Sequence, residues 1–241
     1  MNFLSRSDCD LTASGILIVN MISHTPVTGD SMGKLRFTFD FKKSTQALNF
    51  FAVEEGKQIN KMKALKLVFL ADRYHLRKYG RLITNDNYVA LQHGPVPSTT
   101  KDIAESNDYL ADEIRQYSQL FIEPIDNLVL VSKSAPDKTI FSETDLEALE
   151  FVWKTFGRYN QFQLRDITHT YPEWIKHKKI AESGSCSEMN LRDFLLDPTE
   201  KVPDDLKLDE AAHQIFALNE DEKQLIVETI EERSLIEAFW R

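Results

Sequence analysis

The residues from Asn60 to Tyr79 constrain the fold most, because they form a long, uninterrupted helix pattern. The stretch is rich in good helix formers and contains no proline or glycine. Asn60 is placed to cap the start of the helix, and Gly80 is placed to end it in a left-handed conformation. Apolar residues lie on more than one side, which is typical of a helix covered by several neighbours. We therefore expect this helix to be the central, buried helix of a compact domain.

Two polar residues, Asp72 and His75, interrupt the apolar side of this helix one turn apart. A buried carboxylate costs on the order of several kcal/mol unless it is paired or hydrogen-bonded. We expect Asp72 to accept hydrogen bonds from backbone amides or from an arginine such as Arg81, as part of a structural polar lock. The alternative is an acid/base or metal-binding pair.

Composition indicates an ordinary globular protein. The chain has 241 residues, of which 42% are hydrophobic and 28% are charged. No run approaches the roughly 20 apolar residues of a membrane span, so we expect no membrane contact. The two cysteines, Cys9 and Cys186, are far apart in the sequence. We expect a cytoplasmic protein without a disulfide framework.

Charge is unevenly distributed along the chain. The net charge is −9, but residues 57–81 carry eight Lys or Arg and one acid, whereas residues 200–241 carry twelve acids and five bases. The basic segment could bind nucleic acid locally, although an acidic molecule repels it at long range. The acidic segment could fold back on the basic helix. We favour an acidic surface that binds a cationic protein partner.

Residues 1–31 differ from the rest of the chain. Asp8 and Asp10 precede a short apolar run where a signal peptide requires positive charge, which argues against secretion. Met32 is a candidate alternative start. The other interpretation is that residues 11–22 form an extra strand.

The pattern of the first half predicts helices with small antiparallel elements. We expect a short strand within residues 35–41 and a helix from Ser44, its cap, to Glu55. Turn residues at 85–87 predict a hairpin between Arg81–Thr84 and Tyr88–Leu91. Residues 94–98 are expected to be a rigid extended loop that ends at Ser98, the cap of a helix at 99–104.

The second half continues this α+β, predominantly helical pattern. Ser142 to Asp145 reads as a capping box for a helix that ends near Phe156. The remaining expected elements are helices at 109–120, 161–168 and 220–241, and a hairpin that joins 121–122 to 128–131.

Common catalytic signatures are absent from the sequence. There is no P-loop, dinucleotide-binding, nucleophile-elbow or zinc-protease motif. The six histidines never occur at a usual zinc spacing. A distributed site of Asp72, His75, His93 and His169 stays open. We expect no enzyme activity, no catalytic or metal-binding residue and no cofactor.

Two separated blocks of the sequence resemble the Panacea domain of SocA-like antitoxins. The first runs from Lys66 to Leu76 (KLVFLADRYHL) and continues through YGR at 79–81, DNYVA at 86–90 and GPVPS at 94–98. The second includes His169, Pro172, Glu173 and Trp174, after the capped helix at Ser142. The resemblance covers about residues 40–180.

The resemblance implies an antitoxin of a bacterial or phage type II toxin–antitoxin system. Such a protein neutralises a toxin encoded by a neighbouring gene through protein–protein contact, and some relatives act as adaptors that present the toxin to a protease. It further implies three parts: an N-terminal extension (1–39), the Panacea domain (40–180) and an acidic helical extension (181–241). Leu82 departs from the proline that often follows Gly-Arg, which loosens that turn. No helix-turn-helix segment is evident, so nucleic-acid binding is not expected.

Interface candidates follow from these motifs and from the residue types that dominate protein interfaces. They are Arg73, Arg77, Arg81, Tyr88, His93, Pro95, Pro97 and Trp174. His169, Pro172 and Trp174 form the second signature. Two alternative functions stay open: a metal-dependent or acid/base hydrolase that uses Asp72, His75 and a further histidine, and a nucleic-acid-binding regulator that uses residues 57–81.

Overall fold

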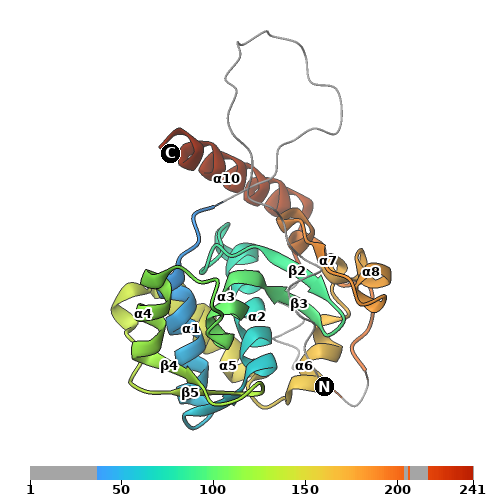
Figure 1. Ribbon diagram of the computed structural model, residues 1–241. Coiled ribbons are helices and arrows are strands. Elements are labelled where there is room, and N and C mark those ends of the chain that lie inside the picture. Colours follow the sequence, from blue (N-terminus) through green and yellow to red (C-terminus); the bar gives the residue numbers. More distant parts are fainter. Residues whose placement is uncertain (1–36, 204–205, 207–216, 241) are drawn as a thin grey trace.

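A single long helix, α2 (Lys61–Tyr79), lies at the centre of the computed structural model (Figure 1). The structure describes residues 37–203, 206 and 217–240. Asn60 caps α2 by accepting from the amide of Lys63, and Gly80 ends it at φ 68°, which confirms both predicted boundaries. Almost every residue of α2 is buried, as expected for a helix enclosed by neighbours.

The start of the described chain differs from the prediction. Residues 37–40 form no strand, and helix α1 (Phe41–Glu54) begins before Ser44. Asp40 is the cap, because its carboxylate accepts from the amide of Lys43, and the Asp40 amide donates to Thr84 O. The alternating apolar residues therefore lead into a helix instead of pairing with another strand.

Two three-stranded antiparallel sheets flank the helices of the described region. The first has the order β1-β5-β4 and contains the predicted hairpin of β4 and β5. The second has the order β3-β2-β6. The bounds are β1 Gln58–Asn60, β2 Tyr88–Leu91, β3 Gly94–Pro97, β4 Ile122–Pro124, β5 Val129–Ser132 and β6 Ser187–Glu188.

The predicted hairpin around residues 85–87 is wrong. Residues 81–84 form no strand; instead β2 pairs with β3, the segment expected to be a loop. The amides of Ile83 and Thr84 donate to the side chain of Asp72, so they are not available to a neighbouring strand. Pro95 and Pro97 fit in β3 because it is an edge strand, where a missing amide proton leaves no neighbour unpaired.

Helix α3 (Ser98–Glu105) is capped by a residue that is distant in sequence. Ser98 makes no side-chain cap. The carboxylate of Asp86 accepts from the amides of Thr99 and Thr100 at 3.1 and 2.7 Å. The expected capping role of Ser98 is therefore taken by Asp86, which lies in the turn before β2.

The helices expected at 109–120, 161–168 and 220–241 are present in the second half of the chain, together with short helices that were not predicted, such as α7 and α8. Ser142 and Asp145 form the predicted capping box of α5. The bounds are α4 Asp112–Phe121, η2 Lys138–Ile140, α5 Glu143–Phe156, α6 Gln161–Thr168, α7 Pro172–Ile175, α8 Lys178–Glu182, η3 Leu191–Leu195 and α10 Glu220–Phe239. The fold is thus α+β and predominantly helical, as expected.

Helix α10 crosses the end of α2 and extends beyond the body of the protein (Figure 1). Its contact with α2 includes Thr229, which packs at Gly80. Within the described ranges, no helix combines the length and hydropathy that a membrane crossing requires. The predictions for residues 1–31 and the start at Met32 lie outside the described residues. The three-part division of the chain stays a prediction.

Cys186 differs from the expectation of unpaired cysteines, because it is disulfide-bonded. The other cysteine, Cys9, lies outside the described residues.

Candidate functional site

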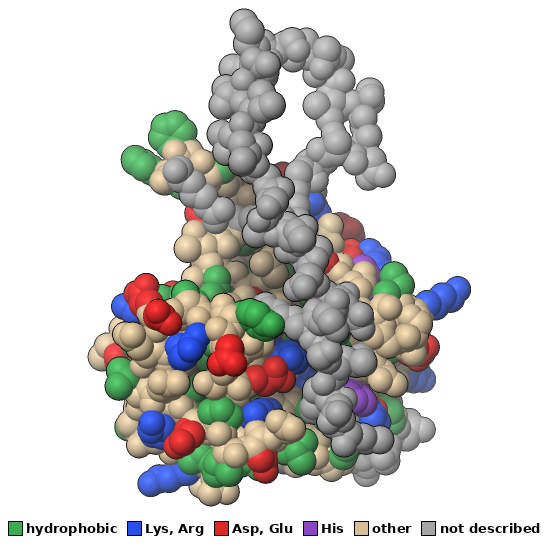
Figure 2. Space-filling model, in the orientation of Figure 1, with side chains coloured by type: hydrophobic (Ala, Val, Ile, Leu, Met, Phe, Trp, Pro, Cys, Tyr) green, Lys and Arg blue, Asp and Glu red, His purple; other side chains and the backbone are tan. Residues whose placement is uncertain are grey.

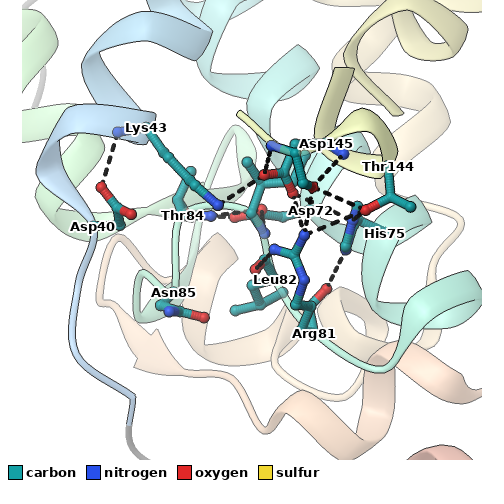
Figure 3. Close-up of polar contacts among 12 residues, drawn as sticks. Asp40, Lys43, Asp72, His75, Arg81, Leu82, Thr84, Asn85, Thr144 and Asp145 are labelled. Atoms are coloured by element: carbon teal, nitrogen blue, oxygen red, sulfur yellow. Dashed lines mark hydrogen bonds and ion pairs between the residues drawn. The ribbon is translucent and has the colours of Figure 1, made fainter. Parts of the chain in front are cut away.

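Asp72 is fully buried in the middle of α2 and is surrounded by donors (Figure 3). Its carboxylate accepts from the amides of Ile83 (2.6 Å) and Thr84 (3.0 Å), from the Thr84 hydroxyl, and from the hydroxyl of Tyr88 at 2.6 Å. Burial raises the pKa of Asp72 to about 6, although these hydrogen bonds oppose the rise. Asp72 therefore ties the 83–84 segment and β2 to the central helix.

His75, one turn later, is also buried, but it contacts a different set of partners (Figure 3). Its Nδ1 donates to Arg81 O at 2.8 Å, which leaves Nε2 to accept from the Thr144 hydroxyl at 3.0 Å. Burial lowers the pKa of His75 to about 4, so the ring is neutral at pH 7. Both nitrogens are occupied, which leaves no lone pair for a metal ion.

Arg81 does not bind Asp72, the partner considered from the sequence. Its guanidinium donates to Asp145 at 2.7 Å, and Lys43 donates to the other oxygen of Asp145 at 2.7 Å (Figure 3). This cluster joins α1 and the start of α5 to the C-terminal end of α2. The polar residues predicted on α2 are thus brought together with residues that are distant in sequence.

Arg73 and Arg77 lie inside the protein, not on its surface. Arg73 Nε donates to Glu173 at 2.6 Å, and both side chains are 0% exposed. Arg77 donates to Asp197 at 2.5 Å and to Phe194 O at 3.0 Å. These arginines hold the 173–197 region against α2, so the expectation that they contact a partner directly does not fit their burial.

The other interface candidates divide by exposure. Tyr88, Pro95, Pro97 and Trp174 are buried, and Trp174 Nε1 donates to Leu91 O at 3.1 Å. Arg81, His93, His169 and Pro172 are only half-buried. The buried members cannot form a docking surface in this conformation, because their side chains already pack in the core.

The basic segment 57–81 is mostly interior as well. Five of its eight cationic side chains are buried: Lys61, Lys63, Lys66, Arg73 and Arg77. Non-specific nucleic-acid binding depends on accessible positive charge that can neutralise phosphates. The local charge seen in the sequence therefore does not become a basic surface.

Lys66 has surroundings that the sequence did not reveal. It is 1% exposed, and its Nζ donates to Pro95 O at 2.6 Å. Among the described residues, no carboxylate lies within ion-pair distance of it. The signal available in the sequence is a lysine on an otherwise apolar turn of the central helix.

The far end of α10 exposes large apolar side chains. Leu235, Ile236, Phe239 and Trp240 are 72%, 49%, 81% and 80% exposed. Figure 2 shows hydrophobic side chains in green at the upper left, where the C-terminal end of α10 leaves the body of the protein. Soluble proteins rarely expose contiguous apolar patches without a function.

The described part of the chain contains no group of three or more His, Cys, Asp or Glu arranged to hold a metal ion. Asp72 and His75 contact separate partners, and His93 and His169 lie near Lys66 instead. The four residues considered as a distributed site are therefore not brought together.

One comparison with known families gives a match. Residues 65–175, from α2 to α7, match the family model described as antitoxin SocA-like, Panacea domain. This region of the chain is similar to a Panacea domain. The match confirms the resemblance seen in the sequence, and the family suggests an antitoxin role that is not enzymatic. Neither the curated proteins nor the solved structures gave a match.

Proposed function

We propose that this protein is an antitoxin that neutralises a toxin encoded by a neighbouring gene, by binding it directly in the cytoplasm. The family match over residues 65–175 is the observation that carries the proposal. Neutralisation by binding requires a stable, preorganised surface and no reaction of the antitoxin itself.

The polar centre of α2 supports a binding role. Asp72 and His75 use their polar atoms in hydrogen bonds within the protein, so they stiffen the domain and have no free group for catalysis. We assign them the role of a polar lock that holds α2, α5 and β2 in fixed positions. A rigid domain loses little conformational entropy when its partner binds.

We propose the end of α10 as the toxin-docking surface. Its exposed apolar side chains can supply the anchors of an interface, as aromatic residues commonly do. Exposed acids on the same helix, Glu228 and Glu232 among them, favour a toxin with an apolar groove and a basic rim. Helix α10 lies outside the matched region, so it is a natural place for specificity toward one toxin.

Co-expression tests the function. The neighbouring gene should stop growth when it is expressed alone, and this chain should restore growth. The proposal fails if the neighbour is harmless, or if it is equally toxic with this chain present.

Matched variants of α10 test the surface. Leu235→Glu should weaken toxin binding about 30-fold or more, the usual effect of losing an interface anchor, and should leave the melting temperature unchanged. Leu225→Glu changes an equally exposed leucine near the start of the same helix and should bind normally. Equal affinity of the two variants would remove α10 as the docking surface.

The same assay separates sequestration from delivery to a protease. If the protein only sequesters the toxin, toxin levels should stay constant and growth should recover in protease-deficient cells. If it acts as an adaptor, toxin should disappear in normal cells and rescue should fail without the protease.

A further inference from the structure

Lys66 is an unusual group to find in a protein core. The ammonium group has three protons to donate, yet within the described part of the chain it donates to one backbone carbonyl, Pro95 O. Burial, and then the charge of Arg165, lower the pKa of Lys66 well below its usual value. A buried lysine without a counter-charge destabilises a protein, so its position calls for a reason other than stability.

The groups around Lys66 are also cationic or able to donate hydrogen bonds. Lys66, Arg165, Lys178 and His93 all lower the pKa of His169, which burial brings to about 3. The Nε2 atom of His169 is buried and has no hydrogen-bond partner, and a neutral imidazole can carry its proton on that atom. Asp166 is the one carboxylate paired here, and it pairs with Arg165, not with Lys66.

Gly94 brings the β2–β3 turn close to these groups. A Cβ atom at this position would lie 2.7 Å from Lys66 Nζ, 3.0 Å from Thr168 Oγ1 and 3.2 Å from His169 Cδ2. Gly94 also has φ +99°, which favours glycine. An amine, a hydroxyl and an imidazole from α2 and α6 therefore converge beside one glycine of the hairpin.

The side chains of this cluster are held in place. The ring of His169 stacks on Trp174 with the centroids 3.6 Å apart and the planes 8° apart. Trp174 is fixed in turn by its hydrogen bond to Leu91 O. His93 and Arg165 are half-buried, so the cluster extends from Lys66 in the core to the surface.

We propose that Lys66 and His169, with Arg165 and His93 at the rim, bind an oxyanion: a carboxylate or a phosphate group. Thr168 lines the site, but its hydroxyl donates to Arg165 O. An anion would supply the counter-charge that Lys66 lacks and an acceptor for His169 Nε2. Convergent cationic donors in a partly buried site are the usual means of recognising such groups. This site is independent of the proposed toxin interface on α10.

Anion-dependent thermal unfolding tests the site. The melting temperature of the whole protein is measured at pH 7 in increasing sodium phosphate, and separately in sodium acetate, with sodium chloride keeping the ionic strength constant. A bound anion stabilises the folded state, so the melting temperature should rise with one of these salts and follow a binding curve. Phosphate and acetate distinguish the two sources of the oxyanion.

The variant Lys66→Met should weaken the affinity for the anion, taken from this binding curve, about 30-fold. This is the loss expected when one partner of a buried charge pair is removed. Lys154→Met is the matched control, because Lys154 is exposed on α5. It should respond like the unmodified protein. If Lys66→Met does not fold, the variant Arg165→Gln at the rim should still weaken the affinity for the anion about threefold.

Two results would overturn the proposal. One is the absence of a saturable rise with either phosphate or acetate. The other is a rise of equal size in the unmodified protein and in a folded Lys66→Met or Arg165→Gln variant, which would indicate non-specific salt effects only.

Discussion

Asp72 and Lys66 lie less than two turns apart on α2, and both are buried, yet their surroundings differ sharply. The carboxylate of Asp72 accepts four hydrogen bonds from three residues. Lys66 donates to one carbonyl and faces other cations. The comparison separates two uses of a buried polar group: Asp72 has the surroundings of a structural residue, and Lys66 has those of a binding residue.

The largest effect is expected at Asp72. Asp72→Ala leaves the amides of Ile83 and Thr84 and the hydroxyl of Tyr88 without an acceptor, which should reduce the free energy of unfolding by about 3–5 kcal/mol. Urea unfolding measures the change. Asp126→Ala, in an exposed turn, should cost far less. Similar losses in the two variants would remove the structural role of Asp72.

The effect of pH on His75 is expected to be smaller. Its folded-state pKa of about 4 is below the usual 6.5, so the unfolded chain takes up a proton first and stability is lost as pH falls through this window. Between pH 7 and pH 5 this should cost about 2 kcal/mol. Asp72 opposes this loss of stability below about pH 6. Its pKa is raised in the folded state, so the folded protein binds this proton more readily than the unfolded chain does.

The contribution of His75 is isolated by subtracting the stability of a His75 variant from that of the unmodified protein at each pH. The stability difference between the unmodified protein and His75→Gln should shrink by about 2 kcal/mol from pH 7 to pH 5, whereas Asp72 contributes equally to both proteins. Parallel stability curves for the two proteins would show that His75 is not held neutral.

The sequence predicted the local parts of this structure well. The ends of α2 at Asn60 and Gly80 and the capping box at Ser142 depend on residues within one turn, so their signals are contained in short stretches. The expectation that Asp72 accepts from backbone amides is confirmed, but the particular donors, and the cap of α3 at Asp86, come from residues that are distant in sequence. No short pattern encodes such contacts.

The candidate site was harder to predict than the fold. The burial of the interface candidates Arg73 and Arg77 could not be predicted, because their partners Glu173 and Asp197 lie 100 and 120 residues away in sequence. Lys66 lies in the same basic segment, but among the described residues the fold gives it no acid. Only the tertiary structure distinguishes a paired buried cation from an unpaired one.

The smallest effect is expected at Lys66. Lys66→Met exchanges a buried cation for an apolar side chain of similar length, so the free energy of unfolding in anion-free buffer should stay within about 1 kcal/mol of the unmodified value or increase. A structural lysine would behave differently, since losing its hydrogen bond to Pro95 O would destabilise the hairpin.

The most direct test is a parallel measurement of the free energy of unfolding of Asp72→Ala and Lys66→Met in anion-free buffer at pH 7. We predict a loss of about 3–5 kcal/mol for Asp72→Ala and little or no loss for Lys66→Met. Equal and large losses would contradict the account, because both residues would then serve only to stabilise the fold.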